Sequence, residues 1–155
     1  MSALTLTRPR TVQAGPIRRS RIALAHTPKC AGQARVWALD TVTGWGVRLS
    51  DRDSFENVTS ELVTNAFEYT AGPLSARLTS CPEFLCLAVH DPDPGPLHLP
   101  TGSLADVPWD EQHGRGLLYA IECTNWVGWR RRNGGKDVRA LWLATARTTT
   151  PGGTS

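Results

Sequence analysis

Two polar side chains, Glu61 and Asn65, interrupt an otherwise apolar pattern in the stretch ELVTNAFEYT, residues 61–70. Residues four apart lie on the same face of a helix, so the carboxylate and the amide are predicted to project together. Such a pair can ligate a divalent cation through oxygen atoms and position a hydroxyl group or water for attack. A Glu followed four residues later by an Asn also arises by chance, so the pair alone does not define a site.

Two other features carry candidate chemistry. The strand-like run FLCLAVH is followed directly by Asp91, where a carboxylate could accept a hydrogen bond from the exocyclic amine of a ligand. An Asp that caps its own turn is the alternative interpretation of this residue. Gly114 and Gly116 lead a predicted helix, where free backbone amides and the helix dipole attract phosphate oxygens. A flexible hinge is the alternative for these glycines.

The periodicity of apolar residues predicts the elements that must position these groups. Helices are predicted at residues 31–42, about 51–70 and 113–124, and strands at 21–26, 74–80, 84–90 and on both sides of a turn at 133–135. The helix at 51–70 has the clearest apolar stripe, with Asp51 or Asp53 as its N-cap. Residues 91–112 are rich in proline, which predicts a long loop without regular structure.

Strands gathered into hairpins with helices between them predict an α+β fold. The expected architecture is a two-layer α/β sandwich, with helices on one face of a mixed, mostly antiparallel sheet. At 155 residues and 40% hydrophobic composition, the chain can form one domain with a core. That domain is predicted at 21–146, between disordered tails at 1–20, which is basic, and 147–155.

The formal net charge of +3 gives little support for nucleic-acid binding. The first 21 residues hold five arginines and no acid, and the rest of the chain holds 12 basic against 14 acidic residues. The main body is therefore slightly acidic, so a DNA-binding face is not expected. The basic run at residues 130–132 fits the solvated tip of a hairpin.

Membrane and metal-scaffold classes are also disfavoured. No apolar run approaches the roughly 18 residues that a membrane-spanning helix needs, and no signal-peptide pattern is present, so a cytoplasmic location is expected. The four cysteines show neither paired CxxC spacing nor the density of a disulfide scaffold. Free thiols are therefore predicted, without a structural zinc site.

The order of the segments adds to these single observations. The chain contains, in this order, ELVTNA, VHDPDPG, HGRGLLYAIE and GGKDVRALWL. This series resembles the histidine-kinase-like ATPase superfamily, which has the Bergerat nucleotide-binding fold. More narrowly, it is similar to the anti-sigma regulatory factors, the serine-kinase branch of that superfamily. The resemblance covers residues 21–145.

The resemblance implies ATP and Mg²⁺ as cofactors and gives roles to individual residues. Glu61 would be the general base that takes the proton from a serine hydroxyl, Asn65 would ligate the magnesium ion, and Asp91 would read the adenine amine. The implied nucleotide-binding set is Asn65, Asp91, Gly95, Gly114, Arg115 and Gly116, under a lid made by residues 96–112.

Three residues depart from the family pattern. Asp93 stands between two prolines where the first glycine box has a glycine, and its charge would weaken nucleotide binding unless the side chain faces away. Tyr69 stands where related sequences often have His. Asp137 stands where a small hydroxyl residue is usual.

Three functions are relevant to these residues and to the resemblance. The first is an ATP-dependent serine/threonine protein kinase that holds a sigma factor and phosphorylates an anti-anti-sigma (STAS-type) antagonist. The alternative is a non-catalytic module that uses the same fold to bind a partner, with weak nucleotide binding or none. The catalytic fragment of a sensor histidine kinase is not favoured, because the chain has no room for an upstream phosphoacceptor hairpin. A homodimer is expected from the resemblance, without direct nucleic-acid or membrane binding.

Overall fold

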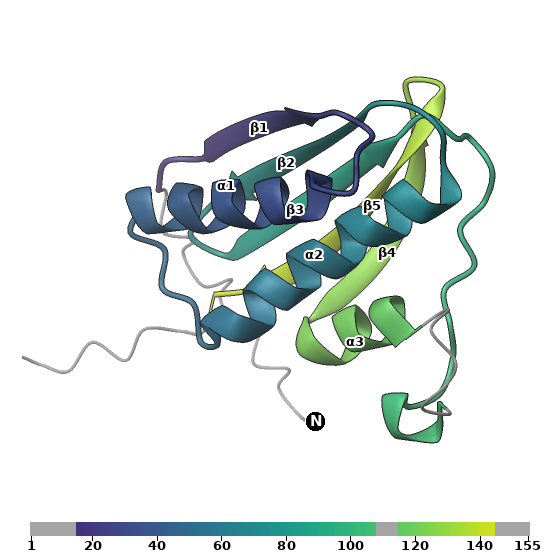
Figure 1. The fold of residues 1–155 in the computed structure, drawn as a ribbon. Coiled ribbons are helices and arrows are strands. Elements are labelled where there is room, and N and C mark those ends of the chain that lie inside the picture. Colours follow the sequence, from purple (N-terminus) through teal and green to yellow (C-terminus); the bar gives the residue numbers. More distant parts are fainter. Residues whose placement is uncertain (1–14, 108–114, 145–155) are drawn as a thin grey trace, which may run out of the picture.

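Five strands form one antiparallel sheet, and three α-helices lie on one of its faces (Figure 1). The computed structural model describes residues 15–107 and 115–144. The elements are β1 (Arg18–Leu24), α1 (Cys30–Gly44), α2 (Arg52–Tyr69), β2 (Leu74–Ser80), β3 (Phe84–Asp91), the 3-10 helix η1 (Leu104–Asp106), α3 (Arg115–Cys123), β4 (Trp126–Arg132) and β5 (Gly135–Leu143). The strand order is β1-β2-β3-β5-β4. The predicted α+β class is therefore confirmed.

The alternation of side chains along the strands separates two faces of the sheet. On β3, Leu85, Leu87 and Val89 are buried in the core, and Leu87 lies opposite Leu78 of β2 and Ala140 of β5. The residues between them point to the other face, which no helix in the described residues covers (Figure 1). The sheet thus has a helix-covered face and an open face.

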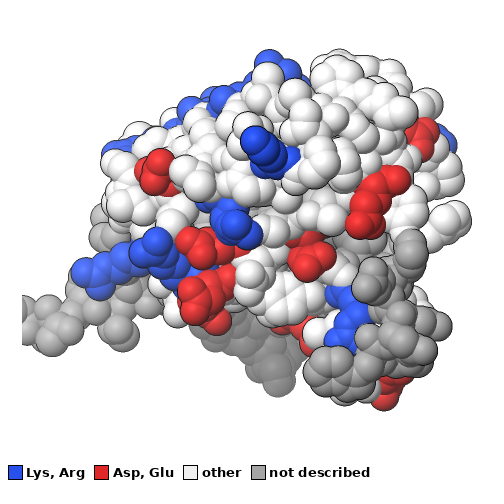
Figure 2. Space-filling model, in the orientation of Figure 1, with Lys and Arg blue, Asp and Glu red and all other residues white. Residues whose placement is uncertain are grey.

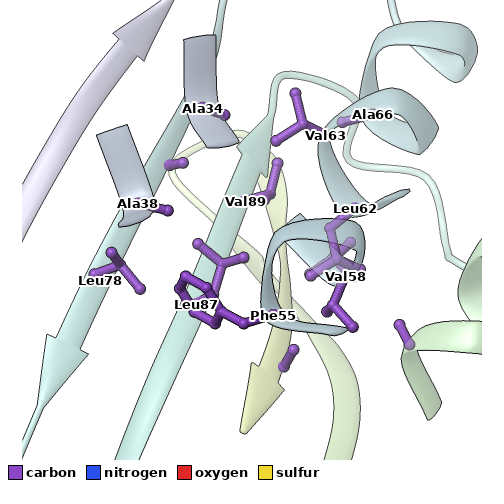
Figure 3. Packing of buried hydrophobic residues seen from close by; sticks show 14 of the residues in the cluster. Ala34, Ala38, Phe55, Val58, Leu62, Val63, Ala66, Leu78, Leu87 and Val89 are labelled. Atoms are coloured by element: carbon purple, nitrogen blue, oxygen red, sulfur yellow. The ribbon is translucent and has the colours of Figure 1, made fainter. Parts of the chain in front are cut away.

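Helix α2 supplies much of the core through its apolar stripe. Phe55, Val58, Leu62, Val63 and Ala66 are buried and lie over the central strands (Figure 3). Asp51 caps the helix, because its side chain accepts a hydrogen bond from the Ser54 backbone N–H at 3.0 Å. Of the two predicted N-caps, Asp51 is correct.

The fold corrects several boundaries predicted from the sequence. Strand β1 begins at Arg18, which pairs with Ser80, and ends at Leu24, so the boundary at residue 21 was wrong. The prediction relied on alternating apolar residues. The first residues of this edge strand were missed because their side chains are polar and exposed or half-buried. All four strand pairings are antiparallel, so the prediction of a mixed sheet was also wrong.

The proline-rich loop contains one short regular element that the sequence did not predict. Helix η1 is capped by Ser103, whose side chain accepts from the Ala105 N–H, and Glu122 of α3 accepts from the Leu104 N–H at 2.8 Å. The Ser103 cap and the Glu122 carboxylate therefore stabilise this short helix within a segment that is otherwise rich in proline. Several predicted segments lie outside the described residues: 108–112 of the lid, 113 and 114 of the predicted helix, 1–14 of the first tail and all of the tail at 147–155. Residues 18–20, predicted as part of the disordered first tail, instead belong to β1.

The thiols agree with the sequence analysis. The cysteines, Cys30, Cys81, Cys86 and Cys123, are all free. Within 15–107 and 115–144, no cluster of three or more His, Cys, Asp or Glu side chains is placed to hold a metal ion. Among the helices of the same residues, none has the length and apolar character needed to cross a membrane.

Candidate functional site

The candidate site begins on α2, where Glu61 and Asn65 lie one turn apart and are both half-buried. Their neighbours Leu62, Val63 and Ala66 point into the core (Figure 3). The two polar side chains therefore flank the apolar stripe, as the spacing predicted. Neither makes a hydrogen bond or an ion pair with another residue that the structure describes.

The first turn of α3 lies against the carboxylate of Glu61. A Cβ atom added at Gly116 would overlap Oε2 of Glu61, so the absence of a side chain is what permits this contact. Elsewhere, Asn57 of α2 donates to the Tyr119 hydroxyl of α3 at 3.4 Å. Two of the predicted site residues, Glu61 and Gly116, are thus brought together by the packing of α2 on α3.

Burial changes the protonation of Glu61. Desolvation raises the pKa of its carboxyl group, and the nearby negative charge of Glu68 raises it further. A carboxylate with a raised pKa accepts protons more readily near neutral pH, which suits a general base.

Asp91 is the last residue of β3, and its carboxylate is engaged inside the protein. It is buried, and its Oδ1 accepts hydrogen bonds from Lys136 Nζ at 3.2 Å and from the Asp93 backbone N–H at 2.9 Å. The two side chains of the Asp91–Lys136 pair are only 3% and 7% exposed. Asp91 therefore caps its own turn, the alternative interpretation, and also forms a buried ion pair.

The loop after β3 folds around the same lysine. Lys136 Nζ donates to the Asp93 carbonyl oxygen at 3.1 Å and lies 3.6 Å from Asp93 Oδ2. Asp93 Oδ1 accepts from the Gly95 N–H at 2.9 Å. This hydrogen bond, and next the charge of Lys136, lower the pKa of Asp93. The side chain of Asp93 is therefore turned onto its own loop.

Lys136 is the site residue that the sequence analysis missed. It is the second residue of β5 and lies directly opposite Asp91, two and four residues before the buried Val138 and Ala140. The alternation of side chains along β5 could have indicated this residue, because it places Lys136 on the helix-covered face together with Val138 and Ala140. Gly135, beside it, permits a close approach of the strands, because a Cβ there would overlap the Asp91 carbonyl oxygen.

The remaining predicted residues are only partly assembled. Arg115 Nη1 donates to the Val107 carbonyl oxygen at 3.2 Å, which links α3 to the segment after η1. Gly114 lies outside the described residues. The two parts of the site are connected through the core, because Val89, two residues before Asp91, belongs to the same buried cluster as Val63 and Ala66 of α2 (Figure 3).

Residues that fit a magnesium nucleotide are present on the α2–α3 side of the site. A carboxylate and an amide that have no partner among the described residues, together with a glycine in the first turn of a helix, can serve a metal ion and phosphate oxygens. On the β3 side, the carboxylate expected to read adenine is engaged by Lys136. Compared with known proteins, the chain matches no family model and has no significant match among curated proteins.

Proposed function

We propose that the protein is a nucleotide-binding regulator of the anti-sigma-factor type, with a Bergerat fold, that acts as an ATP-dependent serine/threonine kinase on an anti-anti-sigma (STAS-type) protein. The observation that carries this proposal is the state of Glu61. Its carboxylate is half-buried, has a raised pKa and has no hydrogen-bond or ion-pair partner among the described residues. An uncompensated carboxylate of this kind is costly to keep and is typical of functional sites.

In this proposal each residue acts through its own chemistry. Asn65 offers an amide oxygen to Mg²⁺, and Glu61 accepts the proton of the serine hydroxyl. Gly116 lets the start of α3 approach Glu61, and the backbone amides there would be available to phosphate oxygens. ATP, when bound, supplies the phosphoryl group. A cytoplasmic location and a homodimer belong to the same proposal.

A second candidate function is favoured by the Asp91–Lys136 pair. Because this carboxylate is already satisfied inside the protein, an adenine amine would have to compete with a buried ammonium group. In the second candidate, the protein is a non-catalytic module that binds its partner without nucleotide. Binding of ATP distinguishes the two functions, because only the first requires it.

Isothermal titration with ATP and Mg²⁺ separates the two candidates. For the kinase, we expect saturable binding that Asn65→Ala weakens by about tenfold or more. Glu61→Gln should leave the affinity nearly unchanged but lower phosphoryl transfer by about 100-fold or more. Glu56→Gln is the matched control, since Glu56 lies on the same helix and pairs with Arg52.

The result that would overturn the kinase proposal is equally specific. If folded wild-type protein shows no heat of binding at millimolar ATP, the non-catalytic module is the better account. Binding that is unaffected by Asn65→Ala would place the nucleotide elsewhere on the molecule. Analytical ultracentrifugation with and without ATP tests the homodimer separately.

A further inference from the structure

The open face of the sheet carries an unusual concentration of positive charge. Its strand positions alternate with those of the core, so their side chains point away from the helices. The arginines at these positions are Arg19, Arg21, Arg77, Arg130, Arg132 and Arg139, which come from four of the five strands. We call this set the arginine band. The helix-covered side, by contrast, exposes both signs of charge (Figure 2).

A single buried acid organises the centre of the arginine band. Asp137 is fully buried, and its carboxylate lies 3.2 Å from Arg77, 3.3 Å from Arg132 and 3.8 Å from Arg139. His90 Nδ1 lies 2.8 Å from the same carboxylate. Asp137 is the only acidic residue at the open-face strand positions. One negative charge holds several guanidinium groups in place and leaves a large positive surplus.

The central arginines are fixed but still reachable. Their side chains are between 25% and 35% exposed, so each guanidinium keeps a surface toward solvent. Arg139 Nε is buried and has no hydrogen-bond acceptor among the described residues. Arginines whose geometry is fixed in advance lose little entropy when they bind a carboxylate in a bidentate manner. The band is therefore suited to bind acidic groups.

An apolar patch adjoins the arginine band on the same face. Trp126 and Leu143 are 51% and 56% exposed, and they lie next to Leu141 and Phe84 in the ladder. The Trp126 ring lies across Gly128, since a Cβ there would overlap the ring. Protein interfaces are enriched in Trp and Arg and depleted in acids, which is the composition found here.

We propose that the open face docks an acidic segment of another protein, one that also carries apolar residues. The terminal segments 1–14 and 145–155 contain no acidic residue, so neither of them can supply the negative charge. A second copy of this chain fits poorly, since a symmetric contact would set the arginine band against itself. This inference goes beyond the proposed kinase and does not depend on nucleotide binding.

The first test uses a fluorescein-labelled peptide that alternates Glu and Leu, measured by anisotropy without nucleotide. We expect saturable binding that weakens with added salt, because the contacts are ionic. The double variant Arg77→Gln/Arg139→Gln should weaken binding by about tenfold or more. The control Arg35→Gln/Arg52→Gln removes the same charge from helices α1 and α2 and should bind like wild type.

A second variant tests the same surface in case the first double variant does not fold. Arg21 and Arg130 are exposed and bind no described residue, so Arg21→Gln/Arg130→Gln removes charge from the band without touching Asp137. It should also weaken binding. Absence of peptide binding, or an equal loss in the control, would overturn the proposal. Tighter binding of oligothymidylate, lost in Trp126→Ala, would overturn it in favour of single-stranded nucleic acid.

Discussion

Glu61 links stability to pH, because its half-buried carboxylate has no hydrogen-bond or ion-pair partner among residues 15–107 and 115–144. Because its pKa is raised in the folded protein, the folded state keeps the proton over a pH range in which the unfolded chain has lost it. Wild-type stability should therefore fall as pH rises from the ordinary range of a glutamic acid toward the raised pKa. Glu61→Gln removes this cost, and we expect a gain of about 0.5–2 kcal/mol near neutral pH.

Urea unfolding of both proteins at a series of pH values checks the sign. The free-energy difference between Glu61→Gln and wild type should grow as pH rises from the ordinary range of a glutamic acid, and should level off above the raised pKa of Glu61. A loss of stability in the variant at neutral pH would mean that the charged carboxylate makes a stabilising contact. Glu56→Gln, which breaks a surface pair with Arg52, should not show this trend.

Gly116, in the first turn of α3, should respond to substitution differently from a glycine with open space around it. In Gly116→Ala the new methyl group would overlap Glu61 Oε2, so the carboxylate has to move. Gly32 in α1 has open space around its Cβ position, and Gly32→Ala should stabilise by about 0.5–1 kcal/mol. We expect Gly116→Ala to show no such gain, and Gly116→Ala/Glu61→Ala to regain it relative to Glu61→Ala.

Thermal unfolding of these variants forms a double-mutant cycle between Gly116 and Glu61. A coupling near zero would mean that the carboxylate moves aside freely, and the contact would then define no site geometry. The cycle measures stability alone. Its result is therefore independent of whether the protein binds ATP.

At the level of elements, the Asp91–Lys136 pair joins the end of β3 to the start of β5. Lys136→Met should cost about 3–5 kcal/mol, because it leaves a buried carboxylate without its cation. The double variant Asp91→Leu/Lys136→Met should recover much of this loss, since apolar residues of similar volume can replace a buried pair. Chemical unfolding of the three proteins measures both effects. Equal stability of Lys136→Met and wild type would contradict this role.

The elements also show what the sequence could and could not predict. The helix at 51–70 was predicted within about two residues because its cap and its apolar stripe are both local signals. Strand β1 was misplaced because its boundary depends on pairing with β2. Lys136 was missed for a related reason. Its role depends on lying opposite Asp91, and the register between β3 and β5 cannot be read from either strand alone.

At the level of the whole molecule, net charge conceals how charge is distributed. The sum over the chain is +3, and the body without its first 21 residues sums to slightly below zero. Alternation along the strands nevertheless places six arginines on one face, with only Asp137 among them. Counting residues could not predict this surface, because it arises from the pairing of strands that are distant in the sequence.

Asp137→Asn tests how far repulsion within the arginine band lowers the stability of the fold. Without the central carboxylate, the guanidinium groups of Arg77, Arg132 and Arg139 repel one another, and we expect a loss of about 3 kcal/mol. Raising salt from about 0.1 M to about 1 M shortens the screening length from about 10 Å to about 3 Å, so part of the loss should be recovered. Asp51→Ala removes an N-cap and should cost about 1 kcal/mol with little dependence on salt. If both variants respond to salt alike in urea unfolding, repulsion within the arginine band does not limit the stability of the fold.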